Sequence, residues 1–254
     1  MSASDGIFSA SFVSHLIELR RRLLKIILLI GALMIGLLPF ANTLYTFVAE
    51  PLSSVLPSDT SMIATQVASP FLTPFKLSLV TALFLAMPYV LHQIWSFVAP
   101  GLYRHEQRLT RPILISSIVL FYLGTLFAYF IVFPLIFAFL TAAAPDGVAV
   151  MTDISHYLDF VLTLFFAFGL AFEVPVATVL LVLMGTTTTL TLRQKRPYII
   201  VGAFVLGMLL TPPDVISQTL LAIPIWLLFE LGVLAAGFVQ QRSHTIERTS
   251  SSIN

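Results

Sequence analysis

The sequence predicts an all-α, polytopic membrane protein, a single domain of 254 residues with six transmembrane helices. Apolar residues make up 58% of the chain and charged residues only 10%, whereas about 25% is usual in a soluble domain. All but one of the 13 Lys and Arg residues fall in four clusters, and successive clusters are far enough apart for two spans. Because basic residues beside spans are retained in the cytoplasm, the clusters mark one side of the membrane. Three outward hairpins then place both termini in the cytoplasm.

The expected elements follow from where the clusters and the apolar stretches lie. The basic clusters are Arg20 to Lys25, Arg104 to Arg111, Arg193 to Arg196, and a tail with Arg242 and Arg248, while Lys76 stands alone. The six spans are expected at about 23–40, 71–98, 112–140, 157–185, 197–210 and 215–238. Residues 8–22 have leucine and isoleucine at helical spacing, which predicts an amphipathic segment along the membrane surface. We expect an external loop over residues 41–70 and a disordered tail over residues 240–254.

Prolines within three of the spans predict bends. The second, third and fourth spans contain Pro88, Pro134 and Pro175. A proline inside a helix removes a backbone hydrogen bond, and in a membrane the neighbouring groups satisfy the freed carbonyl. Three bent helices predict a curved wall. The fifth span has about 14 residues, or roughly 21 Å, against a hydrocarbon core of about 30 Å, so the fifth and sixth spans are expected to be short.

Several classes of function are disfavoured by what the sequence lacks. Cysteine is absent, which leaves no disulfide, thiolate metal site or cysteine nucleophile. Motifs of zinc hydrolases, phosphate-binding loops and serine hydrolases are missing, and the five histidines are scattered. A formal net charge of +1 argues against a nucleic-acid partner. The sequence therefore predicts a protein that is not an enzyme and holds no metal or cofactor, so that a gradient or a partner must drive its work.

Glu173 is the most informative single residue, because it lies in an otherwise apolar stretch of the fourth span. A charge at that depth costs a few kcal/mol, so an acid is retained there for a reason. It is either a functional carboxyl or a structural one whose hydrogen bonds fix helix packing. Glu230 in the sixth span has the same two interpretations. The structural one is favoured for Glu230, because this side chain can snorkel or pair with the basic tail.

Two acids lie inside basic clusters on the predicted cytoplasmic side. Glu18 shortly precedes three consecutive arginines, and Glu106 lies in the first cytoplasmic loop. On a helix, Glu18 either faces a groove or pairs with Arg22 four residues later, and such a pair is worth a few tenths of a kcal/mol. The same ambiguity holds for Glu106.

Five motifs, taken in order, establish a resemblance. They are Ser14-His15-Leu16-Ile17-Glu18-Leu19-Arg20, Ile94-Trp95-Ser96-Phe97-Val98-Ala99-Pro100-Gly101-Leu102-Tyr103, Phe172-Glu173-Val174-Pro175, Lys195-Arg196-Pro197-Tyr198 and Leu210-Thr211-Pro212-Pro213-Asp214. Together they resemble the TatC family, the six-span receptor subunit of the twin-arginine protein translocase. The resemblance covers about residues 12–238.

The resemblance implies a receptor and scaffold in the cytoplasmic (inner) membrane, with a glove-shaped helix bundle. Such a protein recognises signal peptides with consecutive arginines on folded precursors. It recruits TatA-type and TatB-type single-span subunits, associates with itself in a larger complex, and uses the proton-motive force without an enzymatic step. Lipid is its other partner.

The resemblance also assigns roles by position. The signal-peptide residues would be Glu18, Arg20, Phe97 and Glu106, and Glu173 would face the concave side of the bundle. The partner helices would dock at Met208, Thr211 and Gln218, while Pro51 and Asp214 would be structural or functional. For Asp214, capping of the sixth helix is an equal alternative.

Two positions depart from the family pattern, and one other class of function remains as an alternative. The second cytoplasmic loop, Thr186 to Thr191, lacks the expected acids, and Asp159 adds a carboxyl in the fourth span. The alternative is an ion-coupled small-molecule transporter, which would also use Glu173. That class predicts paired polar residues at mid-membrane in two related halves, and the sequence has few such residues and no repeat. An intramembrane hydrolase is disfavoured because no catalytic dyad occupies two span centres.

Overall fold

A computed structural model describes residues 3–53, 62–98, 110–142, 151–210 and 215–251 of the chain. Within these ranges the chain is helical, and its only extended pairing is one bridge between Ile63 and Asp153. The helices are α1 (Ala3–Leu37), η1 (Leu38–Phe40), α2 (Ala41–Ser53), α3 (Ser69–Val98), α4 (Thr110–Phe127), η4 (Ala128–Val132), α5 (Phe133–Ala142), α6 (Ile154–Ala171), α7 (Val174–Leu183), α8 (Thr189–Gln194), α9 (Arg196–Leu210) and α10 (Val215–Ser251). The predicted all-α class is confirmed.

Among the described residues, five helical segments are long and apolar enough to cross a membrane, and α9 is a shorter sixth. The fifth span is therefore short, as its sequence predicts. The sixth span, contrary to expectation, is not short: the apolar part of α10, Gln218–Phe238, has 21 residues, which at 1.5 Å per residue is about 31 Å and matches the hydrocarbon core.

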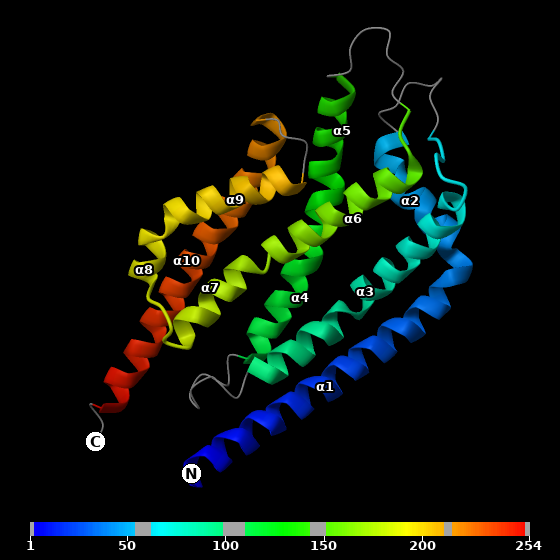
Figure 1. Cartoon of the computed structure of the whole chain (residues 1–254). Helices are drawn as coiled ribbons and strands as arrows, with labels where there is room; N and C mark the ends of the chain where they lie inside the picture. Colours follow the sequence, from blue (N-terminus) through cyan, green and yellow to red (C-terminus); the bar gives the residue numbers. More distant parts are fainter. Residues whose placement is uncertain (1–2, 54–61, 99–109, 143–150, 211–214, 252–254) are drawn as a thin grey trace.

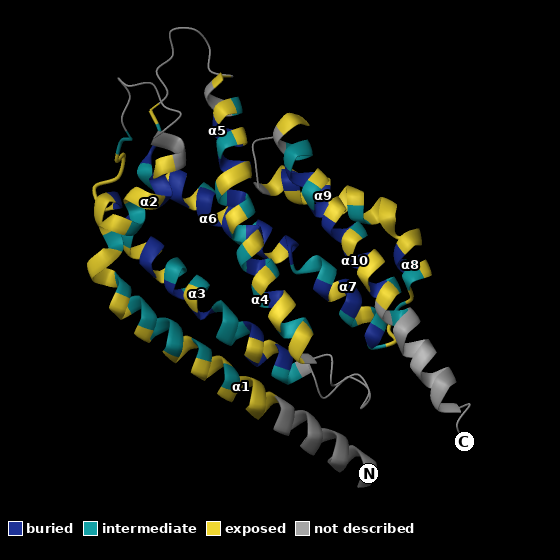
Figure 2. Ribbon diagram, turned by 180° about the vertical axis from the view of Figure 1, so that it is seen from behind, coloured by how far each residue is buried: buried dark blue, intermediate teal, exposed yellow. Residues whose placement is uncertain are grey.

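The helices form a wall in which neighbours cross at an angle (Figure 1). Helix α1 lies along α3 at one edge, α4 and α6 cross in the middle, and α10 packs against α7 and α9 at the other edge. Burial follows this order, because α6 carries many buried side chains while no described side chain of α1 is buried (Figure 2). The beginning of α1 and the end of α10 lie at the same end of the bundle, opposite α2, as the hairpin topology requires.

Three expectations at the ends and in the first loop are wrong. Residues 8–22 do not form a separate surface segment, because α1 continues without a break from Ala3 into the first span. No proline or glycine lies between Gly6 and Gly31 to interrupt it. The predicted loop 41–70 contains α2, and the backbone of the predicted disordered tail is helical as far as Ser251. The tail sequence after Gly237 has no helix breaker, so α10 simply continues.

The predicted bends occur where Pro134 and Pro175 remove backbone donors. Before Pro134 the helix widens into the π-helical segment η4, where the N–H of Phe133 bonds to the carbonyl of Ala128. The fourth predicted span is divided into α6 and α7 by a turn at Phe172 and Glu173, with Pro175 in the first turn of α7. Pro88 lies within the uninterrupted helix α3. Pro134 and Pro175 therefore interrupt their spans, whereas Pro88 does not interrupt α3.

Glycines allow the closest helix crossings. A Cβ on Gly124 of α4 would lie 2.5 Å from the backbone oxygen of Phe168 in α6, and a Cβ on Gly169 would lie 2.7 Å from the ring of Phe121. At the crossing of α10 and α7, a Cβ on Gly232 would lie 2.7 Å from the Cα of Pro175. Small residues let helices approach closely in lipid, where apolar side chains alone give little driving force.

A polar clasp closes the end of the bundle remote from the termini. The Asp153 carboxylate caps α6 by accepting from the backbone N–H groups of Ser155 and His156. It also accepts from the hydroxyl of Thr65 at 2.6 Å and from the Thr65 N–H at 2.8 Å. These donors, the Thr65 hydroxyl first, hold the pKa of Asp153 well below its usual range. The clasp therefore joins the segment before α3 to the start of α6.

We expect Gly124→Ala to destabilise the protein, because the new methyl group would collide with the backbone of α6. Overpacking of this kind costs about 1–3 kcal/mol. The matched control is Gly31→Ala in α1, where a Cβ meets nothing within 4 Å. Thermal unfolding in detergent measures both variants. A lower midpoint for Gly124→Ala than for Gly31→Ala is expected, and equal midpoints would show that the α4–α6 crossing tolerates a side chain.

Candidate functional site

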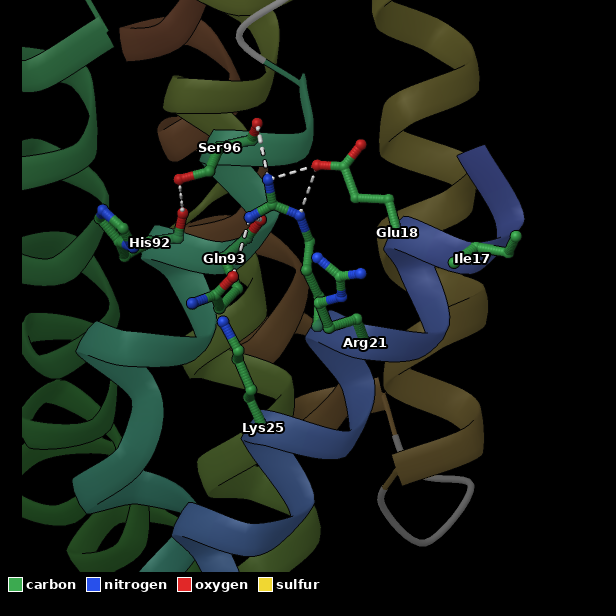
Figure 3. A pocket seen from close by; sticks show the side chains of 8 residues that line it. Ile17, Glu18, Arg21, Lys25, His92, Gln93 and Ser96 are labelled. Atoms are coloured by element: carbon green, nitrogen blue, oxygen red, sulfur yellow. Dashed lines mark hydrogen bonds and ion pairs between the residues drawn. The ribbon is translucent and has the colours of Figure 1, made fainter. Parts of the chain in front are cut away.

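A polar groove of about 530 Å³ lies between α1 and α3, toward the end of the bundle that holds the termini (Figure 3). Its lining residues are Ile17, Glu18, Arg21, Arg22, Lys25, His92, Gln93 and Ser96. The α1 residues repeat at intervals of three and four, so they share one helix face. The α3 residues come from its last two turns and share a face for the same reason. Two helices far apart in sequence therefore build one charged site.

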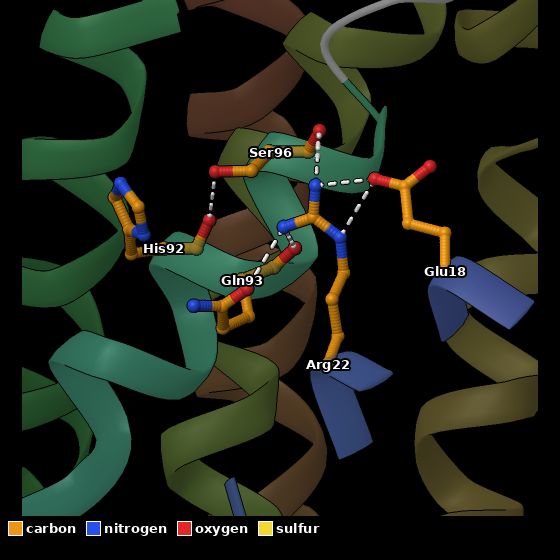
Figure 4. A network of polar contacts seen from close by, with 5 residues as sticks. All are labelled: Glu18, Arg22, His92, Gln93 and Ser96. Carbon is orange, nitrogen blue, oxygen red and sulfur yellow. Dashed lines mark hydrogen bonds and ion pairs between the residues drawn. The ribbon is translucent and has the colours of Figure 1, made fainter. Parts of the chain in front are cut away.

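Arg22 connects the two sides of this groove (Figure 4). Its Nε and Nη2 donate to the same carboxylate oxygen of Glu18, at 3.0 and 2.6 Å. Its Nη1 donates to the side-chain oxygen of Gln93 at 2.8 Å and lies 3.5 Å from the Gln93 backbone oxygen. The Nη2 group also lies 3.5 Å from the backbone oxygen of Ser96. One guanidinium thus contacts a carboxylate, an amide and two carbonyls.

The electrostatics of the groove favour a bound guanidinium. Arg22 is the more buried member of its ion pair, with 21% of its side chain exposed against 48% for Glu18. The carbonyls it reaches belong to the C-terminal end of α3, which carries the negative end of the helix dipole. Among the described lining residues, Glu18 is the one acid beside three basic residues. The lining therefore carries a net positive charge, and Glu18, which Arg22 already contacts, is its one acidic group for a further cation.

The structure resolves the ambiguity about Glu18, since both alternatives hold: it lines a groove and pairs with Arg22. Phe97 is half-buried and follows Ser96 at the end of α3. Arg20 is exposed on α1 but does not line the groove, and Glu106 lies outside the described residues.

Sequence reasoning missed Gln93 and His92 in this groove, together with the roles of Arg21 and Lys25. The helical spacing of Glu18, Arg22 and Lys25 was a signal that could have grouped the α1 residues. Nothing in the sequence reveals that α3 supplies the other side.

Glu173 lies in the turn between α6 and α7, where its carboxylate meets α4. The hydroxyl of Ser117, which is 1% exposed, donates to Glu173 Oε2 at 2.5 Å. The other oxygen, Oε1, is buried and has no hydrogen-bond partner in the described part of the chain. An unpaired buried oxygen is costly, and Oε1 of Glu230 is likewise buried without a partner among the described residues.

The residues expected to dock partner helices are only partly described. Met208 of α9 is 52% exposed. Gln218 of α10 is half-buried, and a Cβ on Gly207 of α9 would lie 3.3 Å from the backbone oxygen of Gln218. Thr211 and Asp214 lie outside the described residues, and Pro51 lies in α2, where only its backbone is described. Met208 and Gln218 thus belong to the hairpin that α9 and α10 form.

Two ion pairs join residues that the sequence left single. Glu230 pairs with Arg196 at the start of α9, at 2.6 Å, and the basic side chains of the tail lie outside the described residues. The pairing follows from the antiparallel packing of α9 on α10, which brings the two side chains together. Lys76 of α3 pairs with Asp159 of α6. The isolated lysine and the additional carboxyl of the fourth span therefore neutralise each other.

The fold and the groove together define a multi-pass helical membrane protein with a charged site at the end that carries both termini. Comparison with known families gives a match over residues 14–224 to the model described as Sec-independent protein translocase protein (TatC). Proteins of that name from Escherichia coli (strain K12) and Azotobacter chroococcum mcd 1 are each 58% identical. The first alignment covers 94% of this chain and 91% of the relative, and the second covers 91% and 90%.

A solved structure, described as the crystal structure of the twin arginine translocase receptor TatC, is also similar. It has a TM-score of 0.78 and 37% identity, and the match covers 89% of this chain and 99% of that one. The chain belongs to the TatC family. It is thus a protein-transport component of the cell membrane, a subunit of the twin-arginine translocase and not an enzyme.

Proposed function

We propose that this chain is the subunit that binds twin-arginine signal peptides of folded precursors, and that the groove between α1 and α3 receives their arginines. The observation that carries this proposal is that Glu18 already holds a guanidinium, that of Arg22, on the face that lines the groove. The receptor named in the solved structure of a relative supports the same function. Glu106 and Phe97 belong to this proposed site, and Arg20 flanks it.

Chemistry favours arginine over lysine as the ligand. Guanidinium is planar and offers five donors that match carboxylate and carbonyl acceptors, while an ammonium group is a compact, strongly hydrated point charge. Glu18 presents a carboxylate beside the amide oxygen of Gln93, and both are already arranged around a guanidinium. A signal peptide with two arginines could then contact Glu18 with one and Glu106 with the other.

We further propose that α9 and α10 receive the transmembrane helices of TatA-type and TatB-type subunits at Met208, Thr211 and Gln218. An exposed Met208 next to a polar Gln218 is the kind of surface that binds a helix in lipid, where interhelical hydrogen bonds contribute roughly 0.6–2 kcal/mol. Contacts of that strength suit subunits that exchange. Self-association within a larger complex and use of the proton-motive force complete the proposal.

Glu173 has a separate role in this proposal, at a step after recognition. Its buried Oε1 needs a donor, which a polar group on an inserted signal segment or a partner helix could supply. An ion-coupled transporter would instead pair such a carboxyl with a second ionisable group at the same depth. Here the described partner is Ser117, and this favours the translocase role.

Replacement of Glu18 by glutamine should weaken binding of an Arg-Arg signal peptide by about tenfold, or roughly 1.4 kcal/mol, since a charge-assisted bond is lost. Fluorescence anisotropy with the full chain in nanodiscs measures this affinity. Asp159→Asn is the matched control, because it removes an acid from the exposed pair with Lys76, away from the groove. Equal affinities for the wild type, the Glu18 variant and the control would remove Glu18 from the site.

Glu173→Ala should leave peptide affinity within about twofold of the wild type, because the residue lies outside the groove, but it should slow export of a folded precursor several-fold. Loss of a buried polar partner costs about 1–3 kcal/mol, which accounts for such a change. Export into membrane vesicles under a proton-motive force is the measurement, with Ser117→Ala as the companion variant. Export at the wild-type rate in the Glu173 variant would return that residue to a structural role.

A further inference from the structure

We propose that Arg22 sets the selectivity of the groove for arginine over lysine, acting as a positioning residue for Glu18. This inference rests on the proposed signal-peptide function. It concerns a residue of the protein itself, an arginine that already contacts one of the two carboxylate oxygens of Glu18.

The contacts of Arg22 use its donors fully. A guanidinium has five N–H donors in one plane. Arg22 directs these toward Glu18 twice, toward the side-chain and backbone oxygens of Gln93, and toward the backbone oxygen of Ser96. The carboxylate and three neutral oxygens therefore surround one planar cation. With only 21% of its side chain exposed, Arg22 is held where water competes poorly for these acceptors.

This arrangement determines what a second cation must do. To reach the Glu18 oxygen that Arg22 contacts, an incoming group must share that oxygen or displace Arg22 from it. Another guanidinium can share or replace these contacts, because its plane and donor spacing match those of the resident group. An ammonium group has no planar fork and must shed a tightly held hydration shell. The resident arginine therefore makes binding harder for lysine than for arginine.

Arg22 also connects the helices that carry the two described residues of the proposed site. The Arg22 guanidinium lies between Glu18 on α1 and Ser96 on α3 (Figure 4), and Phe97 follows Ser96 in the chain. The groove is also lined by the basic side chains of Arg21 and Lys25, whereas Arg22 forms an ion pair with Glu18 at 2.6 Å. Selectivity should thus depend on Arg22 and not on basic charge in general.

The experiment compares two signal peptides, one with Arg-Arg and one with Lys-Lys at the same positions, binding to the full chain in nanodiscs. For Arg22→Gln we expect Lys-Lys affinity to rise about fivefold, the size of one ion pair in this setting. Arg-Arg affinity should rise less, because Glu18 also loses its fixed orientation. The ratio of the two affinities should therefore narrow severalfold.

Two further variants separate geometry from charge. Arg22→Lys keeps the positive charge but loses the planar set of guanidinium donors. We therefore expect the ratio of Arg-Arg to Lys-Lys affinity to fall in this variant as well. Arg21→Gln removes the same charge from the same groove, and it should raise both affinities by the same factor, leaving the ratio at the wild-type value. Gln93→Met removes the α3 acceptor while keeping Glu18 and Arg22, so it narrows the ratio even if the Arg22 variants fail to fold.

Distinct results would overturn the inference and the proposed function. The role of Arg22 would be overturned if Arg22→Gln bound the Arg-Arg and Lys-Lys peptides with the same affinity ratio as the wild type. If the Arg22 variants are unfolded, the same result in Gln93→Met would overturn it. If Arg22→Lys kept the wild-type ratio of Arg-Arg to Lys-Lys affinity while Arg22→Gln lowered it, the charge of Arg22 and not its planar geometry would set the selectivity. An equal decrease of this affinity ratio in Arg21→Gln and Arg22→Gln would also show that basic charge in general sets the selectivity. Absence of Arg-Arg binding to the wild-type chain would instead overturn the proposed signal-peptide function.

Discussion

Close backbone approach between helices is the constraint on which this bundle depends. In lipid, apolar side chains gain little by leaving the solvent, so helices associate through packing and polar contacts. Gly124 and Gly169 let α4 and α6 approach until the backbone of one reaches the side chains of the other, and Gly232 does the same for α10 on α7. These crossings fix the middle of the wall. The edge helix α1 buries no described side chain; it packs along α3, and Arg22 joins it to Gln93 and Ser96 of that helix.

The polar groups of the protein are placed where the fold leaves backbone or carboxyl groups needing a partner. Pro175 prevents α6 from continuing, and the resulting turn presents Glu173 to Ser117 at the depth of the membrane. The carbonyl of Ser96 is among the last four of α3, which have no partner within the helix, and Arg22 reaches it from α1. Arg22 thus supplies donors to acceptors on α3, whereas Glu173 has one oxygen bonded to Ser117 and a second without a partner in the described part of the chain.

Much of the fold could be predicted from the sequence, because charge clusters and apolar length are one-dimensional signals. The basic clusters and apolar stretches predict the six spans and the short α9, and the prolines in the sequence predict where spans are interrupted. The continuity of α1, the helix α2 within the first loop and the helical tail were missed, because loop composition was given more weight than the absence of helix breakers. Glu18 and Glu173 could be singled out as misplaced acids, but their partners Gln93 and Ser117 could not, since a pairing between distant helices leaves no pattern in a single sequence.

The central claim is that the groove between α1 and α3 receives the arginines of the signal peptide. The most direct test places a photocrosslinking residue at Ile17 or Phe97, beside Glu18 but not replacing it, and a control probe at Lys76 at the other end of α3. Membrane vesicles then receive a precursor with Arg-Arg or with Lys-Lys in its signal. The account predicts crosslinks at Ile17 and Phe97 that require Arg-Arg, and none at Lys76 during recognition. Equal crosslinks for both signals, or none from an export-competent precursor, would contradict it.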